Sequence, residues 1–167
     1  RAGDPRGEIT LRQLLQMRSG LRHEEGADPP YQSSEVRMMY LDGRDDMAAW
    51  AEAQPLDHAP GAVFRYSTAT SVILGDIMAR LLAPDGSAAQ RQQAVAQFLD
   101  ARLAVPLRAP SLRAEFDPAG TMVAGSAVWA TARDWARVGD LLRTGGSARG
   151  VQLVPRGWID LMKSESP

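Results

Sequence analysis

The fold prediction depends on residues 60–82, which read PGAVFRYSTATSVILGDIMARLL. Pro60-Gly61 is typical of a turn, and residues 63–66 follow it as a short extended segment. From Ser67 to Leu82 the apolar residues recur at helical spacing, which predicts a buried helix. The side expected to face the core carries Val72, Ile73, Ile77 and Leu81. Tyr66 therefore stands just before the N-terminus of a buried helix.

Helical patterns also dominate on both sides of this stretch. Capping boxes at residues 10–13 and 87–90 each mark the start of a helix, and Thr131 marks another. The first of these helices is expected to end at Ser19-Gly20. Residues 121–128 are small and apolar, which predicts a strand or an extended loop. The other helical patterns lie at residues 36–40, at residues 47–51 and after Pro155, where Trp158, Leu161 and Met162 are expected to face inward.

The composition is that of an ordinary globular domain with one core. Of the 167 residues, 44% are hydrophobic and 23% are charged. The net charge of -1 and the even spread of 18 arginines argue against a nucleic-acid or anionic-membrane partner. Cysteine is absent, which excludes disulfides and thiolate chemistry, and no apolar run approaches the roughly 20 residues that span a bilayer. The sequence does not indicate a cellular compartment.

Both ends of the chain read as interrupted. The first residue is Arg1, with no signal-peptide pattern after it, and residues 164–167 directly follow a helical pattern. We expect residues 1–167 to be a single partial domain of a longer polypeptide, whose remainder is then an obligatory partner.

The sequence contains no pattern typical of a metal or cofactor site. The histidines are His23 and His58, and the segment that begins at His23 carries Ala27 where a zinc-protease helix needs its second ligand. His23 stands in a polar loop and is expected on the surface. No glycine-rich phosphate-binding loop occurs. We therefore predict neither a metal nor an organic cofactor.

No serine of the chain has the pattern of an activated nucleophile. The S-x-x-K motif places a lysine amine one helical turn from a serine hydroxyl, so that the amine can take its proton. The single lysine is Lys163, and Asp160 stands where the serine is required. Residues 145–150 have the wrong glycine spacing for a nucleophile elbow and follow a helix, so we interpret them as a helix C-terminal loop.

Five segments, in order, nevertheless resemble the β-lactamase-related serine hydrolases, which include class C β-lactamases, penicillin-binding proteins and DD-peptidases, esterases and aminohexanoate-oligomer hydrolases. Together they cover almost the whole chain, and the later ones are most similar to the esterase and oligomer-hydrolase branch. The segments are residues 9–21 (family pattern ITIRHLLTMTSGL), 60–67 (PG..F.YS), 72–75 (LLG), 130–139 (sTarDlArfG) and 153–158 (iLPegW).

The resemblance implies a fold and a division of the active site. This chain matches the mainly α, helical portion of the α/β (α+β) serine β-lactamase/DD-peptidase-like fold, so most of the antiparallel sheet is expected to be missing. In the family, the S-x-x-K serine lies before the first of these segments and a Lys- or His-Thr/Ser-Gly strand lies after the last. The nucleophile is therefore expected outside residues 1–167.

The resemblance carries a catalytic role to Tyr66, the tyrosine of the family's Y-x-N or Y-S-x motif. There it helps deprotonate the serine and protonates the leaving group. A phenol titrates near pH 10 and needs a neighbouring cation to act near neutrality, which the upstream lysine supplies. Thr68 occupies a position where many members have Asn, and it is expected to touch the substrate. From spacing alone, Tyr66 reads as a core residue, and Ser67 or Thr68 as a helix N-cap.

Gly125 and Ser126 precede the Thr131 helix, where the family builds a wall of the substrate pocket. Small residues there leave room for an acyl or amide chain, although an extended strand explains them equally well. Trp129 is a further candidate for substrate contact. Asp134 looks catalytic but completes a helix cap, and Trp50, Trp135 and Trp158 lie on helical stripes that suggest a core.

Three functions stay open from the sequence. The first is a serine hydrolase that acts on a small-molecule ester or amide through an acyl-enzyme, with Tyr66 as the proton-transfer residue and no activity in this chain alone. The second is a non-catalytic binding or regulatory module of the same fold. The third is an unrelated helical interaction domain, which a fold without contact between the Tyr66 region and Gly125 would favour.

Overall fold

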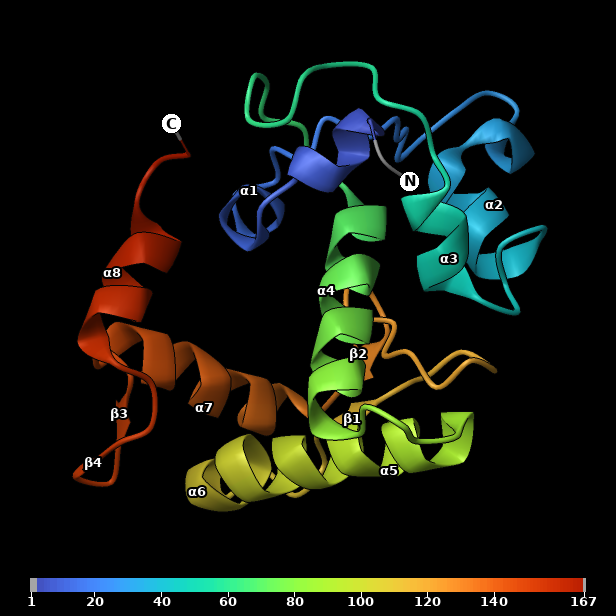
Figure 1. Ribbon diagram of the computed structural model, residues 1–167. Coiled ribbons are helices and arrows are strands. Elements are labelled where there is room, and N and C mark those ends of the chain that lie inside the picture. The colour runs from blue at the N-terminus through green and yellow to red at the C-terminus, as the bar shows by residue number, and fades with distance from the viewer. Residues whose placement is uncertain (1–2, 167) are drawn as a thin grey trace.

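The structure, a computed structural model, describes residues 3–166 (Figure 1). It is mainly helical with two small antiparallel sheets, which agrees with the predicted class. The helices are α1 Leu11–Leu15, α2 Ser34–Tyr40, α3 Met47–Glu52, α4 Thr68–Leu82, α5 Ala88–Leu99, α6 Val105–Leu107, α7 Ala132–Arg143 and α8 Arg156–Lys163. The shorter turns are η1 Pro5–Glu8, η2 Pro30–Gln32 and η3 Asp100–Ala104. The strands are β1 Arg113–Ala114, β2 Val128–Trp129, β3 Ser147–Ala148 and β4 Val151–Gln152.

Helix α4 runs through the centre of the molecule, with α1–α3 around its N-terminal half and α5 across its C-terminal end (Figure 1). Its start is the predicted one, because the Ser67 hydroxyl accepts a hydrogen bond from the Thr70 backbone N–H at 3.0 Å. Val72 and Ile73 are buried in the main core, as expected. This core also holds Leu14, Met38, Met47, Ala48, Ala51, Ala69, Val123 and Ala127.

The predicted burial of Leu81 is wrong. In the last turns of α4 the buried residue is Ala79, which lies on nearly the opposite side of the helix from Leu81 and packs with Val95 of α5. The core-facing side of α4 thus changes where α5 crosses it. A single helical stripe could not show this, because the crossing brings in residues from a separate helix.

Helix α1 starts as predicted but ends earlier than predicted. Thr10 and Gln13 form both hydrogen bonds of the capping box. The helix stops at Leu15 rather than at Ser19, because Met17 adopts a left-handed φ of 55° and turns the chain. The residues after this turn are therefore free to meet the segment before α4.

Helical structure continues without a break from α5 to α6. Pro106 lies in the first turn of α6, and the chain leaves the helix after Leu107. A π-helical turn at η3 joins the two helices. Of the predicted strand at residues 121–128, Val128 alone belongs to a strand, and Met122 forms an isolated bridge with Phe116.

The two last helices form a separate arm (Figure 1). Helix α7 starts at the predicted Thr131 cap and is followed by Gly145 and Gly146, whose φ angles of 70° and 88° end it as expected. The inward orientation predicted for Trp158, Leu161 and Met162 of α8 is wrong. Helix α8 packs through Ile159, which is 1% exposed, so the three larger side chains point to solvent. Trp135 of α7 is exposed as well, against the expectation of a core residue.

Candidate active site

Tyr66 lies on the surface, on the last residues of the segment that enters α4. Its side chain is 54% exposed, so the ring is not sealed in the core. Its hydroxyl has no hydrogen-bond partner among residues 3–166. Arg65 lies beside it in the sequence, but that guanidinium is directed at the Asp57 carboxylate, 3.5 Å away, and at the His23 carbonyl, 3.4 Å away. The phenol is therefore accessible, and the neighbouring Arg65 guanidinium is committed to other groups.

The loop after α1 holds the Tyr66 segment in place. The backbone N–H of Arg65 donates to the Met17 carbonyl at 2.9 Å, and that of Gly61 donates to the Arg18 carbonyl at 2.8 Å. Gly20 is needed at this junction, because a Cβ on it would lie 2.3 Å from the His58 carbonyl oxygen and its φ is 79°. The loop after α1 and the segment before α4 therefore form one hydrogen-bonded unit.

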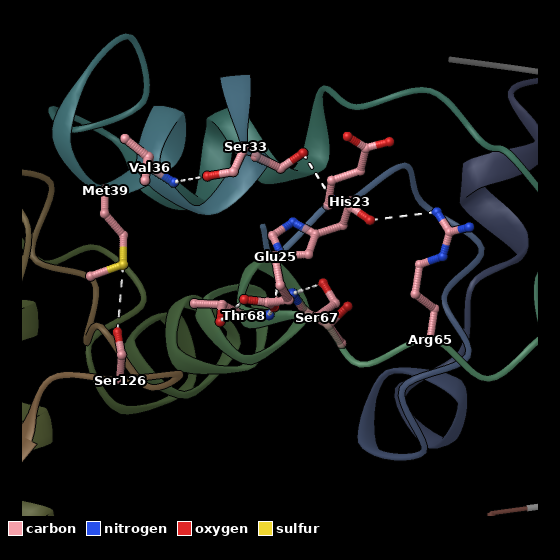
Figure 2. Close-up of polar contacts among 12 residues, drawn as sticks. His23, Glu25, Ser33, Val36, Met39, Arg65, Ser67, Thr68 and Ser126 are labelled. Carbon is pink, nitrogen blue, oxygen red and sulfur yellow. Dashed lines mark hydrogen bonds and ion pairs between the residues drawn. The ribbon is translucent and has the colours of Figure 1, made fainter. Parts of the chain in front are cut away.

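Glu25 connects this loop to the start of α4 (Figure 2). One carboxylate oxygen accepts the Thr68 backbone N–H and lies 2.8 Å from His23 Nε2. The other accepts the Thr68 hydroxyl at 2.9 Å. Thr68 is 2% exposed, so the predicted substrate contact lies in the interior with its hydroxyl hydrogen already donated.

The predicted surface position of His23 is wrong. The side chain is 2% exposed, because the loop folds the ring between α2 and the start of α4, with its Nε2 on Glu25 (Figure 2). Its other ring nitrogen, Nδ1, is buried without a hydrogen-bond partner among the described residues. Neither His23 nor Glu25 was predicted from the sequence to belong to the site. A basic and an acidic side chain two residues apart could have indicated a polar contact there.

Gly125 packs directly against Thr68. A Cβ on Gly125 would lie 2.6 Å from Thr68 Cγ2, so only glycine fits there without a shift. Ser126 is exposed, with its hydroxyl 3.5 Å from the Met39 sulfur (Figure 2). The structure thus brings the Tyr66 segment and the Gly125 segment together through Thr68. This contact disfavours an unrelated helical domain.

Other predicted positions lie apart from this cluster. Trp129 is exposed and donates from its indole N–H to Glu115 at 2.8 Å. Asp134 is buried, and the hydrogen bonds from the Ser111 hydroxyl at 2.6 Å and backbone N–H at 2.9 Å hold the pKa of its carboxyl below the usual range. Asp134 therefore has a structural role, but its carboxylate does not complete the α7 cap as expected: it binds Ser111 and Arg137, and the Thr131 backbone N–H donates to the Ser111 hydroxyl.

An apolar cavity of about 530 Å³ lies between α5, α7 and the β1–β2 pair, and Tyr66 is not among its lining residues. Within residues 3–166, no group of three or more acidic, histidine or cysteine side chains is arranged to bind a metal ion. None of the helices in the described part of the chain combines the length and apolar character needed to cross a bilayer.

Comparison with known proteins gives a family and a fold. The family model described as Beta-lactamase matches residues 1–162. A candidate 6-aminohexanoate-dimer hydrolase from Bacillus anthracis has a similar structure, with a TM-score of 0.72 and 22% identity over 93% of this chain and 41% of its own. A candidate beta-lactamase from Bacteroides dorei DSM 17855 gives a TM-score of 0.62 and 19% identity over 97% of this chain and 44% of its own.

These two likenesses show the fold alone, because the identities are low. The chain spans less than half the length of either structure. None of the curated proteins compared with the chain is a significant match.

Proposed function

The chain belongs to the Beta-lactamase family, and from this premise we propose that it forms part of a serine hydrolase that cleaves an ester or amide bond through an acyl-enzyme. A serine outside residues 1–167 attacks the carbonyl carbon and forms the acyl ester. The bond to the leaving alcohol or amine breaks, and Tyr66 passes the serine proton to that leaving group. Water then attacks the ester and releases the acid.

The position of Tyr66 carries this proposal. The phenol is accessible, stands at the start of the central helix and has its backbone fixed on both sides by hydrogen bonds to one loop. A proton-transfer residue needs both properties, because it must reach the reacting atoms and must hold a constant position there. A tyrosine that served the core alone would need neither.

The cation and the nucleophile come from outside residues 1–167 in this proposal. The sequence contains no S-x-x-K, and the adjacent Arg65 is occupied by Asp57. A lysine beside the phenol would lower its pKa and allow proton transfer near neutral pH. Residues 1–167 alone are therefore expected to be inactive.

The exposed apolar side chains support a missing portion of the fold. Trp158, Leu161 and Met162 of α8, and Trp135 of α7, are large apolar residues with exposed side chains. Apolar side chains that gather on one exposed surface mark a contact with another segment or protein. We propose that the remainder of the polypeptide, including the nucleophile segment and most of the sheet, covers this arm.

Substrate class follows from the same proposal. The candidate substrates are small molecules with an ester or amide bond, and the similar structure from Bacillus anthracis carries the description of a 6-aminohexanoate-dimer hydrolase. Gly125 and Ser126 are proposed to border the acyl side of the pocket, next to Thr68. No metal or organic cofactor enters this mechanism.

A non-catalytic module of the same fold is the second candidate, favoured by the absence of an S-x-x-K in this sequence. The two candidates differ in one experiment, in which Tyr66→Phe is compared with Tyr40→Phe in the complete polypeptide. Tyr40 is also an exposed tyrosine but lies on α2.

We expect Tyr66→Phe to lower kcat/KM for a nitrophenyl ester by about 10²- to 10³-fold, as the loss of a general acid–base does. Tyr40→Phe should leave kcat/KM within about twofold. A complete polypeptide that hydrolyses neither nitrophenyl esters nor anilides, or a Tyr66→Phe variant with full activity, contradicts the proposal.

A further inference from the structure

We infer that Glu25 is a positioning residue of this site: its carboxylate, held by His23, fixes the first turn of α4 and with it the Tyr66 side chain. The inference rests on the proposed function, because positioning matters only if Tyr66 transfers a proton. It assigns a role to the buried polar cluster of His23, Glu25 and Thr68, which the proposed mechanism does not otherwise use.

The carboxylate of Glu25 receives three donors. Thr68 supplies its backbone N–H and its hydroxyl, the latter at 2.9 Å, and His23 Nε2 lies 2.8 Å away (Figure 2). The backbone N–H is one of the first-turn donors that have no partner inside α4. A negative charge at this end of a helix is also favoured by the helix dipole. Glu25 thus caps α4 from a loop 43 residues earlier in the sequence.

The backbone around Tyr66 is fixed on both sides to this one loop. Before it, the Arg65 N–H donates to the Met17 carbonyl at 2.9 Å, and after it the Thr68 N–H donates to Glu25. Two residues, Tyr66 and Ser67, lie between these two hydrogen bonds. Removing the Glu25 carboxylate would free one end of this short segment, and the backbone that carries the phenol would lose its fixed position.

Thr68 cannot follow such a movement freely, because Gly125 lies against its other side. The methyl group of Thr68 faces the space in which a Cβ on Gly125 would lie, 2.6 Å away. Thr68 is therefore held between Glu25 and Gly125. Its buried hydroxyl acts on Tyr66 through the backbone and not through a substrate contact.

His23 orients the carboxylate. An ionised carboxylate only accepts hydrogen bonds, so the hydrogen of the His23 ring stands on Nε2. This tautomer leaves a bare lone pair at the buried Nδ1, which has no partner among residues 3–166. A hydrogen on Nδ1 would leave an unsatisfied donor there instead, and the contact with Glu25 would lose its donor.

The test is Glu25→Gln in the complete polypeptide, with Glu24→Gln as the matched control. The Glu24 side chain is exposed and makes no hydrogen bond to the described residues, although its backbone N–H donates to Ser34. The quantities to be measured are kcat per acylated serine, KM, and the rate of amide hydrogen exchange at Thr68. Glu25→Gln should lower kcat about ten- to hundredfold, as a small misplacement of a reacting group does, with KM nearly constant. Exchange at Thr68 should quicken by about tenfold or more, since its acceptor is weakened.

A purely structural Glu25 gives a different result. Glu25→Gln then lowers the melting temperature and the folded fraction but leaves kcat per acylated serine equal to that of Glu24→Gln, and this outcome overturns the inference. If Glu25→Gln fails to fold, Thr68→Val and Thr68→Ser replace it. The inference predicts a larger loss of kcat for Val, which lacks the hydroxyl donor, and equal losses contradict it.

Failure of the proposed function is recognised separately. A wild-type polypeptide with no acylated serine removes both the hydrolase and this role of Glu25. A wild-type polypeptide that is acylated, combined with an unaffected Glu25→Gln variant, removes only the positioning role. Nitrogen NMR of the wild-type His23 ring provides an independent check, because hydrogen on Nδ1 rather than Nε2 contradicts the proposed orientation.

Discussion

The start of α4 and the α7–α8 arm differ in which kind of side chain they bury and which kind they expose. Around the start of α4, polar residues such as His23 and Thr68 are buried, and both contact the carboxylate of Glu25, which lies 43 residues before Thr68 in the sequence. On the α7–α8 arm, large apolar residues such as Trp158 and Met162 are exposed. In the first region the polar groups of Glu25 and Thr68 are paired within this chain, whereas the second presents apolar side chains that nothing in residues 3–166 covers.

This difference indicates which parts of the proposed site this chain supplies and which parts come from elsewhere. A buried polar cluster is stable only if its hydrogen-bond partners are present, and around Thr68 they are. Exposed apolar side chains gain stability only when another surface removes them from water. We therefore interpret the Tyr66 region as the part of an active site that this chain supplies. The α7–α8 arm is then the surface that contacts the segment with the other part.

The largest expected effect on stability compares two methionines, Met38 and Met162, in the complete polypeptide. Met38 is fully buried in the core, and Met38→Ala should lower the free energy of unfolding by about 2–5 kcal/mol. Met162 is 64% exposed here. If it stays so exposed, Met162→Ala should lower the free energy of unfolding by at most about 0.5 kcal/mol. If the remainder covers the arm, Met162→Ala costs more than about 1 kcal/mol instead. Urea denaturation measures both, and a Met162→Ala variant as stable as wild type contradicts a covered arm.

A smaller effect is expected at the contact between Gly125 and Thr68. Gly125→Ala inserts a methyl group 2.6 Å from Thr68 Cγ2, and overpacking of this kind costs about 1–3 kcal/mol. Gly139→Ala is the control, because a Cβ there meets no atom within 4 Å and the residue lies inside α7, where alanine is favoured by about 1 kcal/mol. Thermal unfolding of both variants should show opposite shifts. A Gly125→Ala variant that is not destabilised would show that Thr68 has free space.

The smallest effect concerns Asp134, at the start of α7. Hydrogen bonds from Ser111 hold the pKa of its carboxyl below the usual value, so its contribution to stability is present above the unfolded pKa, near 4. That contribution is lost as the pH falls through the lower pKa of the folded state. The difference in unfolding free energy between wild type and Asp134→Asn should therefore be greatest at neutral pH and shrink in acid. A difference that does not change between pH 7 and about pH 3 contradicts this assignment.

The sequence predicted local features of the fold well. The caps at Thr10, Ser67 and Thr131 were expected and are present, because a cap involves residues within one turn of each other. The burial of His23 was not predictable in this way, since it depends on how the loop folds against α2 and the start of α4. A polar loop gives no sign of a fold that encloses one of its side chains.

One contact of the candidate site was predictable from the sequence. The motif around Tyr66 predicts the catalytic segment, which stays a prediction, and the contact between this region and Gly125 is present in the structure. Glu25 was missed because its partner, Thr68, lies 43 residues later. The orientation of α8 was wrong because periodicity shows that a helix has an apolar face but not whether this chain covers that face.

The central claim is that the nucleophile served by Tyr66 lies outside residues 1–167, and mass mapping of a fluorophosphonate adduct tests it most directly. The complete polypeptide should carry the label on the serine of an S-x-x-K motif beyond these residues, and residues 1–167 alone should take up no label. A labelled serine within residues 1–167 contradicts the account.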